Sequence, residues 1–226
     1  MRSAWRSVSA VALVLVAIAA AAATLSARDR WYPRTVAETR ELYVTSGDTV
    51  GRLALGFDAV LADIYWIRTV QHYGRDRRSR TYVDRYALLH PLIDITTTLD
   101  PYFATAFQFG ALFLAEPLPN GPDRLDLAVA LLEKGLAAEP ARWQYAQYLG
   151  FLHYWHSGDR QEAGRQFSRA ADIPGAPIWL KPLAANMFID GGDRATARIV
   201  LEALAQSEEP WIRDLAQRKL RELGPS

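Results

Sequence analysis

The chain has 226 residues, a formal net charge of +1 and no cysteine. This length accommodates one or two domains, and the balanced charge gives no bulk electrostatic reason to expect nucleic acid or an acidic partner. The absence of cysteine excludes disulfides, thiolate metal sites, cysteine nucleophiles and haem attachment through cysteine. We expect no cofactor.

The first predicted element is a membrane segment. The whole stretch between Arg6 and Arg28 is free of charged residues. At about 1.5 Å of helical rise per residue, this run just spans a hydrocarbon core of roughly 30 Å. Two interpretations remain open for residues 1–27. An uncleaved signal anchor would place Trp5 and Trp31-Tyr32 at the two interfaces, whereas a secretory signal peptide would be cleaved after an Ala-x-Ala such as 21–23.

Both interpretations export the rest of the chain. The anchor is the preferred prediction, and it implies a single-pass protein of the bacterial cytoplasmic (inner) membrane with an extracytoplasmic carboxy-terminal domain. Cleavage would instead leave a soluble periplasmic protein.

A charged connector is predicted over residues 28–49, ending in a turn and helix N-cap at 46–49. Apolar residues at positions 53, 57, 60, 61, 64 and 67 predict a helix over 53–73. The run RDRRSR at 75–80 is predicted to be a solvated loop, with contact to anionic lipid or a partner as the alternative. The helix expected over 82–98 contains Pro91, which predicts a kink or a restart.

Further helices are predicted in pairs along the remaining chain. The first pair covers 101–115 and 124–138, and its proline-rich connection over 116–124 predicts a rigid loop. A second pair surrounds the turn at 157–159, and a third covers 178–189 and 194–206. The amphipathic segment 211–223 is predicted to be a polar capping helix.

Four triplets of residues recur in register along these helices. The central triplet is Ala163, Phe167 and Ala170, and it places one large residue between two small ones. Ala128, Leu132 and Gly135 repeat it in full. Ala197 and Leu201 repeat its first two members, with Leu204 in place of the small residue, and Leu89 and Ile93 occupy the matching positions of a degenerate unit in which Thr96 replaces the small residue. The last three triplets begin at a nearly constant interval (163 − 128 = 35 and 197 − 163 = 34), and Pro101 and Pro140 close the first two units.

This pattern resembles the tetratricopeptide repeat (TPR), a helix-turn-helix unit of about 34 residues. The resemblance implies an all-α, right-handed α-solenoid over residues 50–226, in addition to the transmembrane helix. Its TPR-like units are approximately 50–100, 101–140, 141–174 and 175–210, followed by a C-terminal cap over 211–226. The stretch with Gly56, Ala62-Asp63, Trp66, Arg68 and Gln71 also resembles bacterial membrane-anchored repeat proteins.

The resemblance also implies a binding groove, because the first helix of each TPR pair lines a concave surface. Carried onto this chain, the groove residues are Phe107, Gln144, Gln147, Phe151, Tyr154 and Trp155. Aromatic rings and glutamines suit an extended peptide. Trp155 is expected to border the groove and Tyr154 to pack inward, with the reverse left open. The alternative is that these aromatic residues simply pack helix on helix.

No catalytic or metal site is predicted. The sequence has no glycine-rich phosphate loop, no Gly-x-Ser-x-Gly and no His-Glu-x-x-His. A metal module using His153 and His156 is the remaining alternative, since they lie at i, i+3. The predicted function is therefore a non-enzymatic, membrane-tethered scaffold that binds an envelope or membrane protein. A permanent accessory subunit of a larger membrane complex is the second interpretation.

Overall fold

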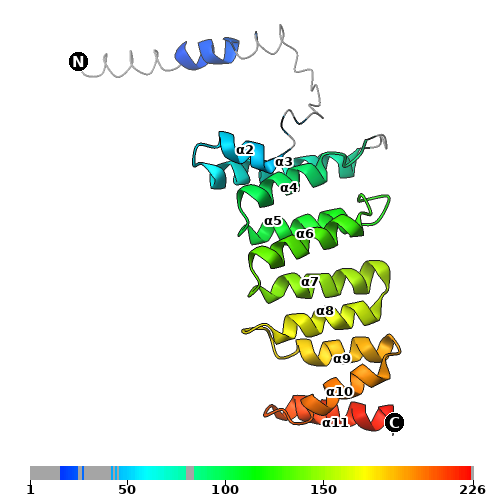
Figure 1. Ribbon diagram of the computed structural model, residues 1–226. Coiled ribbons are helices and arrows are strands. Elements are labelled where there is room, and N and C mark those ends of the chain that lie inside the picture. The colour runs from blue at the N-terminus through cyan, green and yellow to red at the C-terminus, as the bar shows by residue number, and fades with distance from the viewer. Residues whose placement is uncertain are drawn as a thin grey trace, which may run out of the picture. The chain divides into compact units, whose positions relative to one another are not determined.

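The structure is a computed structural model that describes residues 16–24, 27, 42, 44, 46–79 and 84–224. All the regular secondary structure in that part of the chain is helical, which confirms the all-α prediction. The chain divides into two compact units, residues 1–42 and 43–226. All the helices labelled in Figure 1 belong to the second unit.

The first unit contributes one short described helical segment. Residues 16–24 and residue 27 are helical and exposed. Among the residues that the structure describes, no helix combines the length and the apolar character needed to cross a membrane. Most of the predicted membrane segment 1–27 and most of the connector 28–49 lie outside the described residues. The membrane anchor therefore stays a prediction.

The second unit is a succession of short helices (Figure 1). From α3 onward, each α-helix packs against the next one in the chain. The helices are α2 (Gly47–Leu53), α3 (Asp58–Arg78), α4 (Leu89–Leu99), α5 (Ala104–Ala115), α6 (Leu125–Ala138), α7 (Trp143–Leu152), the π-helical turn η1 (His153–Ser157), α8 (Arg160–Asp172), α9 (Leu180–Asp190), α10 (Arg194–Leu204) and α11 (Pro210–Leu223).

Turn and capping residues explain where α8 and α10 begin. Asp159 accepts a hydrogen bond from the Glu162 amide at 2.9 Å, and Asp193 accepts one from the Thr196 amide at 3.0 Å. Each aspartate follows a glycine with positive φ, and each satisfies a backbone donor that the first helical turn leaves free. The repeated Gly-Asp-Arg sequence therefore ends one helix and starts the next.

Both helix-interior prolines occupy a first turn. Pro91 is the third residue of α4, and Pro182 is the third residue of α9. The first four amides of a helix have no intrahelical acceptor, so a proline there removes no hydrogen bond. Because residues 84–88 form turns and α4 begins only at Leu89, Pro91 lies in the first turn of the helix and marks neither a kink nor a restart, and the helix predicted over 82–98 is shorter than expected.

Every member of the four triplets is buried, so the sequence period coincides with the packed faces of α4, α6, α8 and α10. Glycines make room for large buried rings on neighbouring helices, among them the triplet member Phe167. A β-carbon built on Gly150 would lie 2.6 Å from the Phe167 ring, and one built on Gly164 would lie 2.9 Å from the Phe188 ring. Close approach at glycine is therefore part of how these helices pack.

The structure corrects two predicted boundaries between residues 53 and 80. The helix expected over 53–73 is interrupted, because Leu55 and Gly56 adopt φ angles of 51° and 89°. The predicted loop at 75–80 is helical as far as Arg78. Arginines in a last turn interact favourably with the helix dipole, and the buried Asp76 carboxylate accepts the Tyr86 amide at 2.7 Å.

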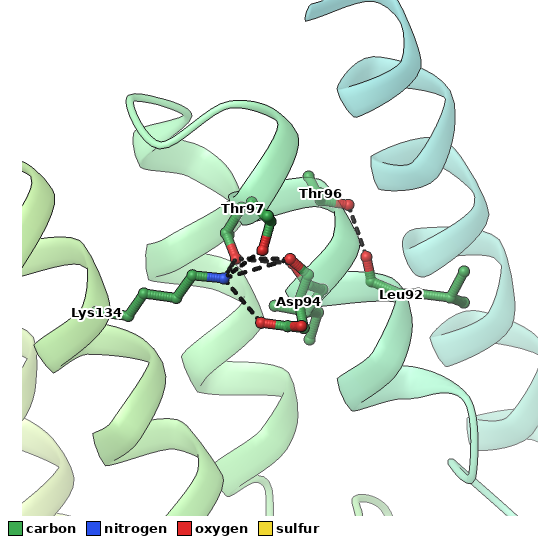
Figure 2. A network of polar contacts seen from close by, with 7 residues as sticks. Leu92, Asp94, Thr96, Thr97 and Lys134 are labelled. Atoms are coloured by element: carbon green, nitrogen blue, oxygen red, sulfur yellow. Dashed lines mark hydrogen bonds and ion pairs between the residues drawn. The ribbon is translucent and has the colours of Figure 1, made fainter. Parts of the chain in front are cut away.

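A lysine connects two of the predicted repeat units. Lys134 on α6 donates to Asp94 Oδ1 at 2.8 Å and to the hydroxyls of Thr97 and Thr98 at 3.0 and 2.8 Å (Figure 2). The Lys134 and Asp94 side chains are both more than a third exposed, so solvent screens this pair. The contact orients α6 on α4 and contributes little to stability.

The proline-rich connection between α5 and α6 is hydrogen-bonded to the body of the fold. The Asp123 amide donates to the Glu116 carbonyl at 2.9 Å, and the Arg124 amide donates to the Leu114 carbonyl at 2.7 Å. In addition, the Tyr73 hydroxyl donates to the Glu116 carboxylate, and the Tyr86 hydroxyl donates to the Asn120 carbonyl. These bonds hold the connection against α3 and the turn that follows it.

Candidate functional site

Exposed aromatic rings gather at the carboxyl end of α7. Phe151 stacks on Trp155 with ring centroids 4.7 Å apart and an interplanar angle of 9°. The same Phe151 ring meets the buried Phe167 ring edge-on at 5.1 Å. The indole of Trp155 therefore packs on Phe151, which in turn packs on the buried Phe167, although the indole itself is 61% exposed.

Tyr154 and Trp155 differ less in solvent exposure than predicted. Tyr154 is 38% exposed, so it is not the inward-packing residue that the sequence suggested. Its ring lies 6.2 Å from that of Trp155, and the Arg160 guanidinium carbon lies 6.0 Å above it. Both residues belong to the π-helical turn η1, whose wider winding departs from the 100° step assumed for a regular helix.

The two predicted glutamines lie on the same face of α7 as Phe151, the residue on which Trp155 stacks. Gln144, Gln147 and Phe151 are partly exposed and lie at i, i+3 and i+7 on α7. Residues at these spacings form one stripe of a helix. The structure therefore places four of the six predicted groove residues, counting Trp155, on a continuous surface, which we call the α7 surface.

A shallow pocket of about 290 Å³ adjoins Gln144 at the amino end of α7, and Glu139, Arg142 and Trp143 line it together with Gln144. The Arg142 Nε lies 2.7 Å from the Glu139 Oε2 in an ion pair. The Tyr145 hydroxyl lies 3.4 Å from the same carboxylate, and burial raises the pKa of Tyr145, which keeps that hydroxyl protonated. The pocket offers hydrogen-bonding groups beside the α7 surface.

Phe107 is a correction to the predicted groove. Its side chain is fully buried, and its ring lies 5.4 Å from that of Tyr145. A β-carbon on Gly135 would lie 3.0 Å from both rings, so the two aromatics fill the space that this glycine leaves. Phe107 therefore belongs to the core and is not accessible to a partner.

A second pocket, of about 330 Å³, was not predicted from the sequence. Its lining includes Arg85, Tyr86, His90, Leu118 and Arg124. Arg124 is engaged by Asp126 through two hydrogen bonds of 2.8 and 2.6 Å, and this pairing lowers the pKa of Asp126 to about 2. Because a carboxylate already neutralises one of its cations, the pocket is a weak candidate for an anionic ligand.

A feature that the sequence did not reveal concerns α3 and the residues just before it. Apart from Leu61, which is partly buried, the predicted apolar stripe and two further apolar residues are turned to solvent, with side chains between 43% and 87% exposed. We call this surface the α3 apolar face: Val60, Ile64, Ile67 and Val70 on α3, together with Leu53 at the end of α2 and Leu55 and Phe57 in the connection between α2 and α3. The buried residues of α3 are Ala62, Thr69, His72 and Asp76. The period of the stripe was detectable from the sequence, but the direction in which it points was not.

The third interpretation, a metal module, finds no support in the geometry. Within residues 46–79 and 84–224, no three His, Asp or Glu side chains gather so that they could hold a metal ion. His153 and His156 lie partly exposed in η1.

Comparisons of the chain with models of protein families, with curated proteins and with solved structures find no match. The resemblance to the TPR therefore rests on the residues of this chain alone.

Proposed function

We propose that residues 50–226 form a right-handed α-solenoid of TPR-like units capped by α11, and that this array is a non-enzymatic scaffold for protein partners. Residues 1–27 tether it to the outer face of a bacterial cytoplasmic membrane. The partner is an envelope or membrane protein that presents an extended segment to the α7 surface.

The stacked Phe151–Trp155 pair carries this proposal. The exposed Trp155 indole stacks on Phe151, and tryptophan is among the residue types most enriched in the hot spots that dominate binding energy. Gln144 and Gln147 continue the stripe with groups that hydrogen-bond a peptide backbone. Because Phe167 supports Phe151, the surface is preorganised, which lowers the entropic cost of binding.

A second candidate function is a permanent subunit of a larger membrane complex. The α3 apolar face favours it, because monomeric soluble proteins rarely expose a continuous apolar surface of this kind. In that case the partner would cover α3 rather than α7.

The test is Trp155→Ala, with Trp211→Ala as a matched control. Trp211 lies on α11 and is 46% exposed, so both substitutions remove an exposed indole. Each full-length variant would be purified in mild detergent, its co-purifying proteins identified by mass spectrometry, and its melting temperature measured. We expect Trp155→Ala to weaken partner binding by about 2 kcal/mol or more, roughly 30-fold in Kd, with little change in melting temperature.

Partner retention by Trp155→Ala, with loss in a variant of α3 such as Ile64→Ser, would favour the permanent subunit. If Trp155→Ala and Trp211→Ala lose the partner to the same extent, the loss is not specific to the α7 surface and the proposal fails.

A further inference from the structure

The α3 apolar face is held in a fixed orientation. On the opposite side of α3, the Trp66 and Tyr73 rings stack on Phe113 with centroid distances of 6.0 and 4.0 Å. The carboxylate of Asp76 on α3 also binds the Tyr86 amide. The helix therefore cannot roll to bury its apolar side without breaking these contacts, and the apolar side chains from Phe57 to Val70 stay exposed along about 20 Å of helix.

The two ends of the array differ in polarity. The exposed residues of α11 at the carboxyl end include Asp214, Gln217, Arg218 and Glu222, as expected for a repeat cap that meets water. At the amino end, α3 exposes isoleucine, valine and phenylalanine. The carboxyl end is suited to contact with water, and the amino end is suited to contact with an apolar phase.

Charge distinguishes a bilayer from a purely apolar partner. Arg52, Arg68, Arg75 and Arg78 are exposed beside or just beyond the apolar side chains, whereas Asp48 and Asp63 are the exposed carboxylates of the same stretch. A helix that lies in a membrane interface combines an apolar face with flanking basic residues, which reach the anionic headgroups.

The chain that precedes α2 can bring this face to a membrane. The uncharged run ends at Ala27 and α2 begins at Gly47, so positions 28–46 connect them. At about 3.3–3.6 Å per residue this connection reaches at most roughly 70 Å, so a tether in the bilayer leaves α3 within reach of the headgroups.

We propose that the α3 apolar face is a membrane-surface contact that inserts into the interface of a bilayer rich in anionic phospholipid. The exposed arginines bind lipid phosphates while Phe57, Val60, Ile64 and Ile67 enter the region between headgroups and acyl chains. The inference deepens the proposed function and rests on its membrane tether for proximity. It also accounts for the apolar surface that otherwise favours a permanent subunit.

The absence of cysteine permits a direct test on the full chain. Val60→Cys, Ile67→Cys and the control Ile199→Cys would each carry one environment-sensitive fluorophore, since Ile199 is 68% exposed on α10. The proteins would be reconstituted in vesicles of phosphatidylcholine with or without phosphatidylglycerol, and a spin-labelled lipid would report contact. We expect blue-shifted, lipid-quenched emission at positions 60 and 67 in the anionic vesicles, and water-like emission at position 199.

A charge control tests the arginines. In the Val60→Cys chain, Arg68→Gln with Arg75→Gln should weaken the bilayer contact by about 30-fold, since each arginine near an anionic surface contributes roughly a factor of five. Arg218→Gln with Arg221→Gln removes two exposed arginines from α11 and should leave quenching unchanged.

Three results would overturn the inference: emission at position 60 as water-like as at 199, emission that is blue-shifted but not quenched by lipid, or equal quenching without phosphatidylglycerol. The second would identify a protein segment as the occupant. Extraction of the protein by alkaline carbonate reports separately on the tether, so failure of the tether and failure of the α3 contact are distinguishable.

Discussion

Gly150→Ala tests how closely α7 and α8 approach each other. A β-carbon at this position would lie 2.6, 2.7 and 2.9 Å from three atoms of the Phe167 ring. That ring is 1% exposed and meets Phe151 edge-on, so it has no free space into which to withdraw. Forcing a methyl group into such a core costs about 1–3 kcal/mol. The higher helix propensity of alanine offsets about 1 kcal/mol of this, which leaves a net loss of up to about 2 kcal/mol.

The matched control is Gly74→Ala, the same change inside α3. A β-carbon there would meet only the far end of the Arg78 side chain, at 3.7 Å. With nothing to overpack, alanine should stabilise this helix by up to about 1 kcal/mol. Both variants would be unfolded in urea and followed by circular dichroism. The two free energies of unfolding should differ by about 1–3 kcal/mol.

A double-mutant cycle locates the cause of that difference. Phe167→Leu shortens the side chain that the new methyl group strikes, so the Gly150→Ala penalty should shrink in this background. Residues in contact show coupling energies of about 0.5–3 kcal/mol. If Gly150→Ala stabilises the protein as much as Gly74→Ala does, or if the cycle gives no coupling, the new methyl group does not overpack against Phe167.

Three further predictions concern the tether, the core and a helix cap. Alkaline carbonate should not extract the protein if the uncharged run before Arg28 is an uncleaved anchor; a mature amino terminus near Thr24 would show a cleaved signal peptide instead. Ala163→Leu should lower the free energy of unfolding by about 1–3 kcal/mol, because Ala163 is fully buried, whereas leucine at the exposed Ala137 of α6 should change it little. The hydrogen bond from the Thr196 amide lowers the pKa of Asp193, so its stabilisation of α10 is present above about pH 4 and is lost as pH falls through the lowered pKa. Asp193→Asn should remove that part of the acid dependence in urea unfolding at pH 2–6, and an unchanged profile would show that the cap does not titrate as described.

The sequence by itself determined the all-α class and the faces that α4, α6, α8 and α10 bury. Triplets such as Ala163, Phe167 and Ala170 identified packed faces because an α-helix has about 3.6 residues per turn, so residues three and four apart lie on one side of it. The caps Asp159 and Asp193 are also local features, because an N-cap bonds an amide in the first turn of its own helix, but only a turn at 157–159 was predicted there.

Only the tertiary structure decided which surfaces remain open. The period of α3 is the same whether its apolar side meets a helix or solvent, and the outcome depends on Trp66 and Tyr73 stacking on Phe113 of α5. Phe107 occupies a groove position in the TPR pattern, but it is buried because Gly135, on the following helix α6, admits its ring. The exposure of α3 and the burial of Phe107 both depend on residues of other helices. The residue pattern within a single helix does not identify those neighbours.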